Sequence, residues 1–515
     1  MDVPTKNPAT SAVTYTADNE IQRVENPPEG ARFLQIVAKA DQLTVDQPPP
    51  SKNKHKLIRV AFRVSRLMEF CSKRELENQT SHSVWEWPLV VLKELFDNAL
   101  DACEEAEVAP VIEVIVGPPG FIIIADNADG IAAATITSIL DYTIRVSSRE
   151  AYVSPTRGAQ GNALKTILAM AYVLDRERPG SDVDAVGVTI IESRGVRHRI
   201  EFKVDHVKSE PKIVHTTTPC DRTVGTKITI EWPNSEQLLK NAEHRFKHLA
   251  SSYLFFNPHL SLRGIWHDKE FVNVKATNPN WQKWGPRDPT SPHWYNEGRL
   301  QRYFAAHVAR DRDLGRDRTV REFIAEFRGL SGTAVQHKIL AEVGCSHQSL
   351  AQFFGVDQVN RVGIAKLLVA MKRHSKPVNP KLLGIIGADH LRACFLRSGG
   401  NAETFKYEQR KGLTEDGIPY VIEFAFGLHQ SGLGPEPATV SRKIVTGANW
   451  SVAIGNPFHS FGSTGEGLDS TLANVRANAT APVICALHLA SAHIQYADRG
   501  KSSIILTDDA RQPDV

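Results

Sequence analysis

The segment Lys93-Glu-Leu-Phe-Asp-Asn-Ala-Leu-Asp-Ala102 lies in a stretch of helical periodicity that runs from about residue 89 to residue 107. On a helix, Glu94 and Asn98 share one face because they are four residues apart, and Asp97 and Asp101 share the face beside it. An acid and a carboxamide can therefore point together into one pocket. In that pocket Glu94 can polarise a water molecule and Asn98 can bind a metal ion.

A second stretch, Asp126-Asn-Ala-Asp-Gly-Ile131, follows about one helix, loop and strand later. Residues 121–125 before it are continuously apolar and rich in isoleucine, which is typical of a buried strand. Asp126 stands where this strand ends, and binding groups commonly lie at such strand ends. The spacing of the two stretches predicts half of an ATP site, although Asp126 can also merely cap the next turn.

A glycine-bearing segment, Arg157-Gly-Ala-Gln-Gly-Asn-Ala-Leu-Lys165, precedes an apolar helix expected at residues 166–174. Gly158 and Gly161 allow the backbone to approach a polyanion closely. The helix that follows presents free N–H groups and the positive end of its dipole to phosphate oxygens. A Gly-x-x-Gly alone is weak, but its order and distance relative to the two stretches above favour a phosphate site.

Length and composition limit the class of protein. A chain of 515 residues with 41% hydrophobic and 23% charged residues is globular, and its length indicates two to four domains. A net charge of +3 excludes a polycation, so any DNA contact must come from local patches. The six cysteines form no Cys-x-x-Cys pair, which favours free thiols in a reducing cytosol. No stretch reaches the roughly 18 apolar residues of a membrane span, so we expect a soluble cytoplasmic protein without membrane contact.

Composition changes along the chain predict an N-terminal arm and three folded units. Residues 1–55 are rich in Pro, Thr, Asn and Lys, and we expect a mobile or exchanged arm with little fixed structure. Residues 56–275 mix helical and strand patterns, as in a helix-and-sheet sandwich. Residues 276–375 contain amphipathic helical stretches and no evident strand, and residues 376–515 return to mixed character. The expected fold class is α+β.

The elements expected in these units follow from hydrophobic periodicity. Helices are expected near 64–78, 89–107, 132–142, 166–174, 300–307, 319–327, 333–343, 361–372 and 468–477. Strands are expected near 111–116, 121–125, 186–192, 197–204, 225–232, 420–427, 449–454 and 483–488.

These motifs together resemble the GHKL ATPase superfamily, which joins gyrase, histidine kinases and MutL, and within it the family of B subunits of DNA topoisomerase VI. Residues 93–106 and 126–131 resemble the first and second ATPase motifs, and Arg157–Gly161 resembles the lid. Further matching segments extend the resemblance over nearly the whole chain. They are Gly225-Thr226, the strand segment 256–262, the helix-two-turn-helix-like segment from 319–327, the transducer entry 380–387, and 487–491 with 498–502.

The resemblance implies a Bergerat-type α/β sandwich ATPase domain, a small helical insert and a C-terminally short α+β transducer domain. It implies that Glu94 is the general base and Lys501 a transducer lysine that reaches the γ-phosphate. Asn98 then binds Mg²⁺, Asp126 accepts a hydrogen bond from the adenine amino group, and Thr226 assists through water. The implied nucleotide-binding residues are Asn98, Asp101, Asp126, Gly130, Ile131, Gly158, Ala159, Gln160, Gly161, Asn162, Ala163 and Thr226.

Three features depart from the family pattern. Ala128 stands where the family has the first glycine of its Asp-x-Gly-x-Gly motif, and Asn162-Ala163 replaces Ile-Gly after the lid. Because alanine requires a negative φ far more strongly than glycine, we expect stiffer loops and either a shifted geometry or weaker nucleotide binding. The chain also stops about fourteen residues after Lys501, so we expect the helix that grips the DNA-cleaving A subunit to be missing or short.

The function that the resemblance implies is an ATP-hydrolysing subunit of a type IIB topoisomerase-like complex. It would use ATP and Mg²⁺, form an ATP-dependent homodimer, act on DNA and work with a separate A-type cleaving subunit. A stand-alone ATP-gated clamp or DNA-binding module in plasmid maintenance or defence remains an alternative. A histidine kinase is less favoured because no phosphoacceptor helix precedes the motifs, and a chaperone offers no place for the helical insert.

For Lys501 and for the basic residues of the helical region, simple solvent exposure is the alternative to contact with phosphate. Lys501 lies near the end of the sequence, where lysines are usually solvated. The basic residues between 310 and 321 alternate with aspartates, which favours a solvated mixed-charge face over a DNA track. Arg328, His337 and Lys338 are the remaining candidates for phosphate contact.

Overall fold

The computed structural model describes most of the chain after residue 70. The described ranges are 12–15, 71–118, 120–142, 151–158, 163–177, 184–205, 210–232, 236–355, 358–430, 441–460, 466–498 and 501–506, without side chains at 12–15, 163 and 236. Most of the expected arm (1–55) and four lid residues (159–162) lie outside these ranges.

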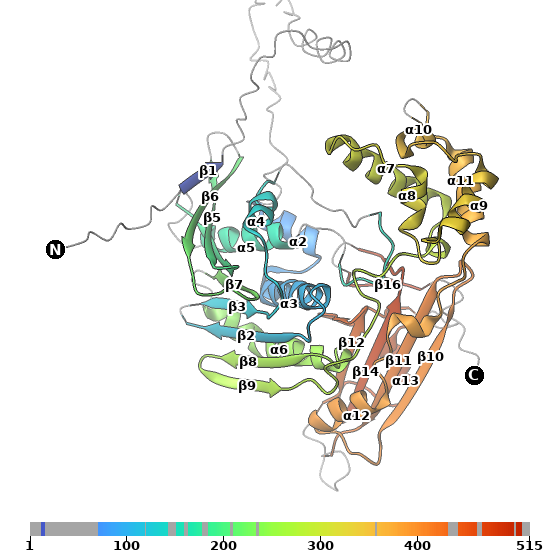
Figure 1. Ribbon diagram of the computed structural model, residues 1–515. Coiled ribbons are helices and arrows are strands. Elements are labelled where there is room, and N and C mark those ends of the chain that lie inside the picture. Colours follow the sequence, from blue (N-terminus) through green and yellow to red (C-terminus); the bar gives the residue numbers. More distant parts are fainter. Residues whose placement is uncertain are drawn as a thin grey trace, which may run out of the picture.

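The first half of the described chain builds a nine-stranded sheet, called the first sheet (Figure 1). Its strands pair antiparallel except β2 and β8, which are parallel. In spatial order the strands are β1 (Ala12–Tyr15), β6 (Glu210–Pro219), β5 (Val196–Asp205), β4 (Gly187–Ser193), β7 (Thr226–Glu231), β3 (Phe121–Ala125), β2 (Val111–Gly117), β8 (Ser261–Trp266) and β9 (Lys269–Val274). The buried residues of β3 and β7 alternate with more exposed ones, as expected when one face of a sheet is covered.

A layer of helices covers one face of the first sheet. The helices of this part are α2 (Lys73–Thr80), η3 (Val84–Glu86), α3 (Trp87–Glu105), α4 (Ala133–Ile139), α5 (Ala163–Arg176) and α6 (Glu236–Phe256). Pro88 lies in the first turn of α3, where its missing N–H costs no helical hydrogen bond.

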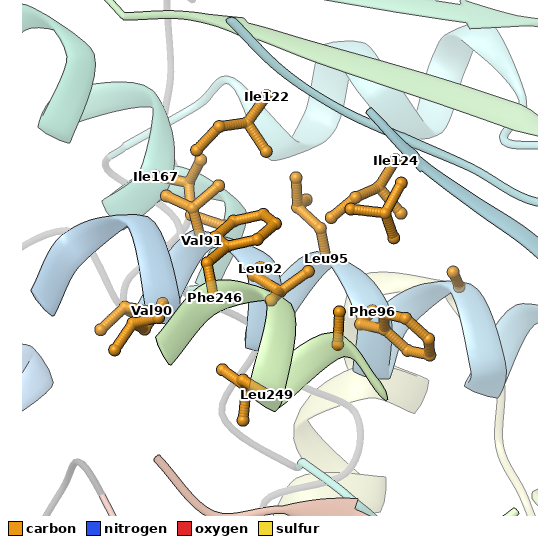
Figure 2. Packing of buried hydrophobic residues seen from close by; sticks show 14 of the residues in the cluster. Val90, Val91, Leu92, Leu95, Phe96, Ile122, Ile124, Ile167, Phe246 and Leu249 are labelled. Carbon is orange, nitrogen blue, oxygen red and sulfur yellow. The ribbon is translucent and has the colours of Figure 1, made fainter. Parts of the chain in front are cut away.

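Helix α3 lies at the centre of the helical layer, in contact with both the sheet and α6. Figure 2 shows Leu95 of α3 close to Ile124 of β3, and Phe246 of α6 beside Val91 and Leu92. Nearly all of the α3 side chains between residues 87 and 100 are buried. Because α3 is packed on two sides, its remaining polar face is held in a fixed direction.

The last third of the chain builds a five-stranded sheet, called the second sheet, in which β12 and β14 are parallel. In spatial order its strands are β10 (Lys406–Leu413), β11 (Pro419–Leu428), β14 (Val483–Ser491), β12 (Lys443–Ala448) and β13 (Ser451–Val452). Its flanking elements are η5 (Pro380–Leu383), α12 (Ala388–Arg397), α13 (Leu468–Asn474), and the short pair β15 (Gln495–Tyr496) and β16 (Ile504–Ile505). Helix α6 contacts β12 and β13, so the second sheet packs directly against the helical layer.

Between the two sheets in sequence lies a group of helices with its own aromatic core. It comprises η4 (Pro292–Trp294), α7 (Glu297–Asp313), α8 (Val320–Ala325), α9 (Thr333–Val343), α10 (Leu350–Phe354) and α11 (Arg361–Arg373). Thr319 with Glu322 and Ser349 with Gln352 form capping boxes at the starts of α8 and α10, which explains why these short helices begin where they do. Phe304, Phe323 and Phe353 pack together at its centre.

The expected α+β class is confirmed, as are most of the expected elements. Helix α3 and strands β2 and β3 match their expected ranges within two residues. The sequence analysis missed α6, α10, α12, β6, β9, β10, β12, β15 and β16, and it placed one strand at 449–454 where a turn separates β12 from β13. Strand β1, which pairs with β6, lies in the arm where little fixed structure was expected. None of the helices within the described ranges has the combined length and apolarity that a membrane crossing requires.

Candidate functional site

The polar face of α3 carries the predicted acid and carboxamide. Glu94 is partly buried, with 33% of its side chain exposed, and Asn98 one turn later is exposed. The Nζ atom of Lys93 lies 3.8 Å from Glu94 Oε1. Glu94 therefore has access to solvent and a fixed cation beside it, which suits a carboxylate that orients water.

Asp126 follows β3 directly and is held at the end of the strand by backbone donors. Its Oδ1 atom accepts hydrogen bonds from the N–H groups of Ala128 (2.9 Å) and Thr226 (3.1 Å). Both bonds go to Oδ1, which leaves Oδ2 as the oxygen able to accept a ligand's donor. Burial raises the pKa of the Asp126 carboxyl above its usual range, although the two backbone hydrogen bonds act against the rise.

Two glycines allow the loop after β3 to close against the start of β7. Gly225 has a φ of +73°, and a Cβ atom there would lie 1.9 Å from the carbonyl oxygen of Asp126. Gly130 has a φ of +78°, and its Cβ would lie 2.5 Å from Ser193 Oγ. No side chain can occupy either position without movement of the backbone. Ile131, next to Gly130, is partly buried and its N–H donates to the same Ser193 Oγ.

Ala128, which departs from the family pattern, fits its loop. It is buried, it is absent from the residues with positive φ, and its carbonyl accepts a hydrogen bond from the N–H of Gly225 at 2.7 Å. An alanine is not strained at a negative φ. Ala128 is therefore accommodated at a negative φ, and whether the loop is shifted or nucleotide binding is weaker stays a prediction.

Lys501 reaches the same region from the opposite end of the chain. The loop between β15 and β16 carries it, and its Nζ atom donates to the carbonyl oxygen of Arg157 at 2.5 Å. A Cβ atom on Gly158 would lie 3.7 Å from this Nζ. The lysine is thus placed beside the first two residues of the predicted lid, 344 residues away in sequence.

The electrostatic surroundings of Lys501 are those of the α3 face. Burial lowers the pKa of its ammonium group, and the positive charge of Lys93 adds to this effect. The carboxylates of Glu94, Asp97 and Asp101 act in the opposite direction. Lys501 therefore lies within electrostatic range of Glu94, the predicted base on α3.

Arg157, at the start of the predicted lid, is anchored in the interior. Its guanidinium donates to Asp101 Oδ1 (2.7 Å), to both oxygens of Glu104 (2.7 Å each), to Asn257 Oδ1 (2.8 Å) and to the carbonyl oxygen of Trp450 (3.4 Å). All five N–H donors of the guanidinium are used.

Glu104 is the second centre of this buried cluster. It also contacts Lys283 Nζ at 2.8 Å and His259 Nε2 at 3.1 Å. Burial alone would raise the pKa of Glu104, but Arg157 and Lys283 outweigh it and hold the pKa well below its usual range. The cluster joins α3, the lid entry, the end of α6 and the second sheet.

The predicted residues fall into two groups in the structure. One group comprises Lys501 beside Gly158, within electrostatic range of Glu94 on α3, where Asn98 follows Glu94 by one turn. The other group lies at the ends of β3 and β7 and comprises Asp126, Gly130, Ile131 and Thr226. Asp101, assigned to the nucleotide by resemblance, lies in the ion pair with Arg157. Ala159, Gln160, Gly161 and Asn162 lie outside the described residues, and Ala163 is the first residue of α5.

The structure adds polar residues that the sequence analysis did not single out as part of a site. Lys93, Glu104, Asn257, Lys283 and Ser451 each contact an acid of α3 or Arg157. Lys93 and Asp97 have the i, i+4 spacing of a helical ion pair, which is the one signal that the sequence offered. Glu104 lies on α3 as well, whereas Asn257, Lys283 and Ser451 come from distant segments.

A magnesium ion and a nucleotide are compatible with these donors. In the described part of the chain, no group of three or more His, Cys, Asp or Glu side chains could hold a metal ion. Mg²⁺ in nucleotide sites is usually bound by one or two protein oxygens together with substrate phosphates. The exposed amide of Asn98 supplies such an oxygen one turn from Glu94.

Comparisons with known proteins agree with the motifs. The B subunit of type 2 DNA topoisomerase 6 from Archaeoglobus fulgidus is 24% identical over 443 residues, which are 81% of this chain and 66% of that protein. The corresponding protein of Methanococcoides burtonii is 26% identical over 196 residues, 37% of this chain and 30% of that protein. The chain thus spans less than two thirds of the length of either relative. No protein-family model matches the chain.

Solved structures with a similar course of the chain include the MutL ATPase domain of Aquifex aeolicus complexed with ADP. It is 12% identical, with a TM-score of 0.30 over 77% of this chain and 90% of that one. The ATPase region of topoisomerase II from Saccharomyces cerevisiae is 10% identical, with a TM-score of 0.35 over 82% and 78% of the two chains. The resemblance indicated by the motifs is confirmed at the level of sequence: this chain is similar to the B subunits of DNA topoisomerase VI.

Proposed function

We propose that this chain binds ATP with Mg²⁺ and hydrolyses it, as the ATP-binding subunit of a type IIB topoisomerase-like DNA-processing complex. One observation carries the proposal. Lys501, from the far end of the chain, donates to the carbonyl of Arg157 at the entry to the predicted lid, within electrostatic range of Glu94, and Asn98 follows Glu94 by one turn of α3. A base, a metal-binding amide and a cation suffice for phosphoryl transfer, which depends mainly on positioning and charge.

Each side chain has one task in this proposal. Glu94 accepts a proton from the attacking water, and the carboxamide of Asn98 provides an oxygen for Mg²⁺. Asp126 presents Oδ2 to the adenine amino group while the backbone holds its Oδ1 in place. Thr226, buried at the start of β7, contacts the edge of the adenine through a water molecule, and Gly130 leaves room for the adenine ring.

Lys501 connects the nucleotide to the second sheet. Its ammonium donates to the carbonyl of Arg157. A γ-phosphate beside Gly158 offers this cation a stronger, charged acceptor, so Lys501 would exchange the carbonyl for the phosphate. The exchange would pull on the β15–β16 loop, and loss of the phosphate after hydrolysis would release it.

The larger assembly is part of the same proposal. We infer an ATP-dependent homodimer, contact with DNA, a separate DNA-cleaving A-type subunit and a cytoplasmic location. We also infer a division of the chain into an arm (1–55), an ATPase domain (56–275), a helical domain (276–375) and a transducer domain (376–515). The sequence relatedness to topoisomerase VI B subunits supports this assembly.

An ATPase assay with and without supercoiled DNA tests the proposal. Wild-type protein should release phosphate from ATP, and Glu94→Ala should bind ATP without releasing phosphate. Light scattering with a non-hydrolysable ATP analogue should detect a dimer. Absence of phosphate release under all conditions would refute the proposed ATPase activity. A monomer at all concentrations would refute the proposed ATP-dependent dimer. DNA-stimulated turnover without any cleaving partner would instead favour a stand-alone clamp without strand passage.

A further inference from the structure

The turn between β12 and β13 has a strained backbone. Asn449 and Trp450 form a two-residue hairpin loop between the paired residues Ala448 and Ser451, with φ values of 48° and 64°. Positive φ at both positions is the geometry of a type I′ turn, for which Asn-Gly is the usual sequence. A tryptophan there is unfavourable on its own, so the surroundings must hold it in place.

Contacts with β14 of the same sheet and with three earlier segments of the chain hold this turn in place. The N–H of Trp450 donates to His488 Nε2 at 2.9 Å, and its carbonyl accepts from Asn257 Nδ2 at 3.0 Å. Its indole is fully buried, with Lys283 Nζ 4.5 Å from the ring centroid. Asn449 Nδ2 reaches the carbonyl of Thr156, directly before the lid entry, at 3.4 Å.

Ser451, the next residue, contacts Asp97 of α3, three residues after the predicted base Glu94. Its hydroxyl donates to Asp97 Oδ2 at 2.6 Å, across 354 residues of sequence. Tyr253 of α6 donates to the other oxygen, Asp97 Oδ1, at 2.8 Å. Lys93 also donates to Asp97 Oδ2 at 2.8 Å, and the same ammonium lies 3.8 Å from Glu94 Oε1.

Lys93 is therefore shared between two carboxylates. Burial alone would lower the pKa of its ammonium group, but Asp97 and Glu94 outweigh this effect and raise the pKa, so Lys93 remains charged. The hydroxyls of Ser451 and Tyr253 satisfy part of the negative charge of Asp97. Without the Ser451 hydroxyl, more of that charge falls to Lys93, which is then drawn toward Asp97 and away from Glu94.

We propose that Ser451 is a positioning residue, which acts through Asp97 and Lys93 to fix the carboxylate of Glu94 for hydrolysis. The inference rests on the proposed function of Glu94 as the base. It gives the second sheet a contact with the catalytic helix that does not involve Lys501. A movement of the β12–β13 turn would change the rate of hydrolysis even when ATP stays bound.

Removal of one hydroxyl tests this role. We expect Ser451→Ala to lower kcat for ATP about tenfold, while KM and the affinity for a non-hydrolysable ATP analogue stay within about twofold. Ser451→Thr keeps the hydroxyl and should restore most of kcat. Thr446→Val is the matched control, because Thr446 of the same hairpin is buried and donates to the carbonyl of Gly455, away from Asp97.

The outcomes separate this inference from the proposed function. The positioning role would be overturned if Ser451→Ala had the kcat of wild type, or if Thr446→Val lost as much kcat as Ser451→Ala. The proposed function would stand in either case as long as Glu94→Gln remains inactive. A KM that rises in step with the fall in kcat would also overturn it, because a general structural defect gives that result. Full turnover in Glu94→Gln would overturn the proposed base and the inference together.

Discussion

Replacement of Arg157 by methionine should destabilise the protein strongly. The guanidinium is wholly buried, and its five donors are bonded to Asp101, Glu104, Asn257 and Trp450. Methionine keeps much of the apolar stem and removes every donor. The variant then tests the ion network rather than the packing.

The magnitude follows from what the substitution leaves behind. Asp101, with 20% of its side chain exposed, loses the guanidinium that pairs with it. Glu104, with 8% exposed, keeps Lys283 and His259. Removal of one partner from a buried ion pair typically costs about 3–5 kcal/mol, and the retained partners of Glu104 place the expected loss toward the lower end of this range.

Urea denaturation followed by circular dichroism measures the loss. Arg263→Met is the matched control, because Arg263 pairs with two carboxylates, Glu113 and Glu270, but has 52% of its side chain exposed. Its change should be too small to separate from wild type. Addition of Glu104→Gln to Arg157→Met should cost less than the sum of the single changes, since each single change already breaks the shared ion pair between Arg157 and Glu104. A loss below about 1 kcal/mol in Arg157→Met would refute the reasoning.

Two further outcomes are expected. Asp126→Asn keeps the oxygen that accepts from Ala128 and Thr226, so the melting temperature should not change. The variant loses the acceptor for the adenine amino group, so calorimetry should find the ATP affinity reduced about tenfold or more. Unchanged affinity would contradict the adenine contact. Burial, assisted by Arg157, lowers the pKa of His488 to about 3, against about 6.5 in the unfolded chain. Between these two pH values only the unfolded chain binds a proton at His488. The free energy of unfolding therefore falls as the pH falls, by about 1.4 kcal/mol per pH unit. His488→Gln should remove that part of the slope in urea denaturation between pH 6.5 and 4.5, and an equal slope in both proteins would contradict the assignment.

The core of the site was predictable because its signals are local. Glu94 and Asn98 are one helical turn apart, and the apolar run before Asp126 marks a strand that ends at a loop. Periodicity and spacing within about 40 residues therefore predicted α3, β3 and the order of the motifs. Gly130 and Gly225 fit the same pattern, since their positive φ angles require glycine.

The parts that join the two sheets were not predictable in this way. Ser451 meets Asp97 across 354 residues, and Arg157 meets the carbonyl of Trp450 across 293. Neither contact leaves a periodic pattern in the sequence, because each depends on how two sheets pack. Trp450 even misled the strand prediction, because the sequence gives no sign that it adopts a left-handed turn conformation.

The central claim is that Glu94 activates water for ATP hydrolysis. Phosphate release and ATP binding, measured together on wild type and Glu94→Ala, test it most directly. The claim predicts that the variant binds ATP with an affinity within about threefold of wild type and releases phosphate at least about 100-fold more slowly. Equal rates of phosphate release in the two proteins would contradict it.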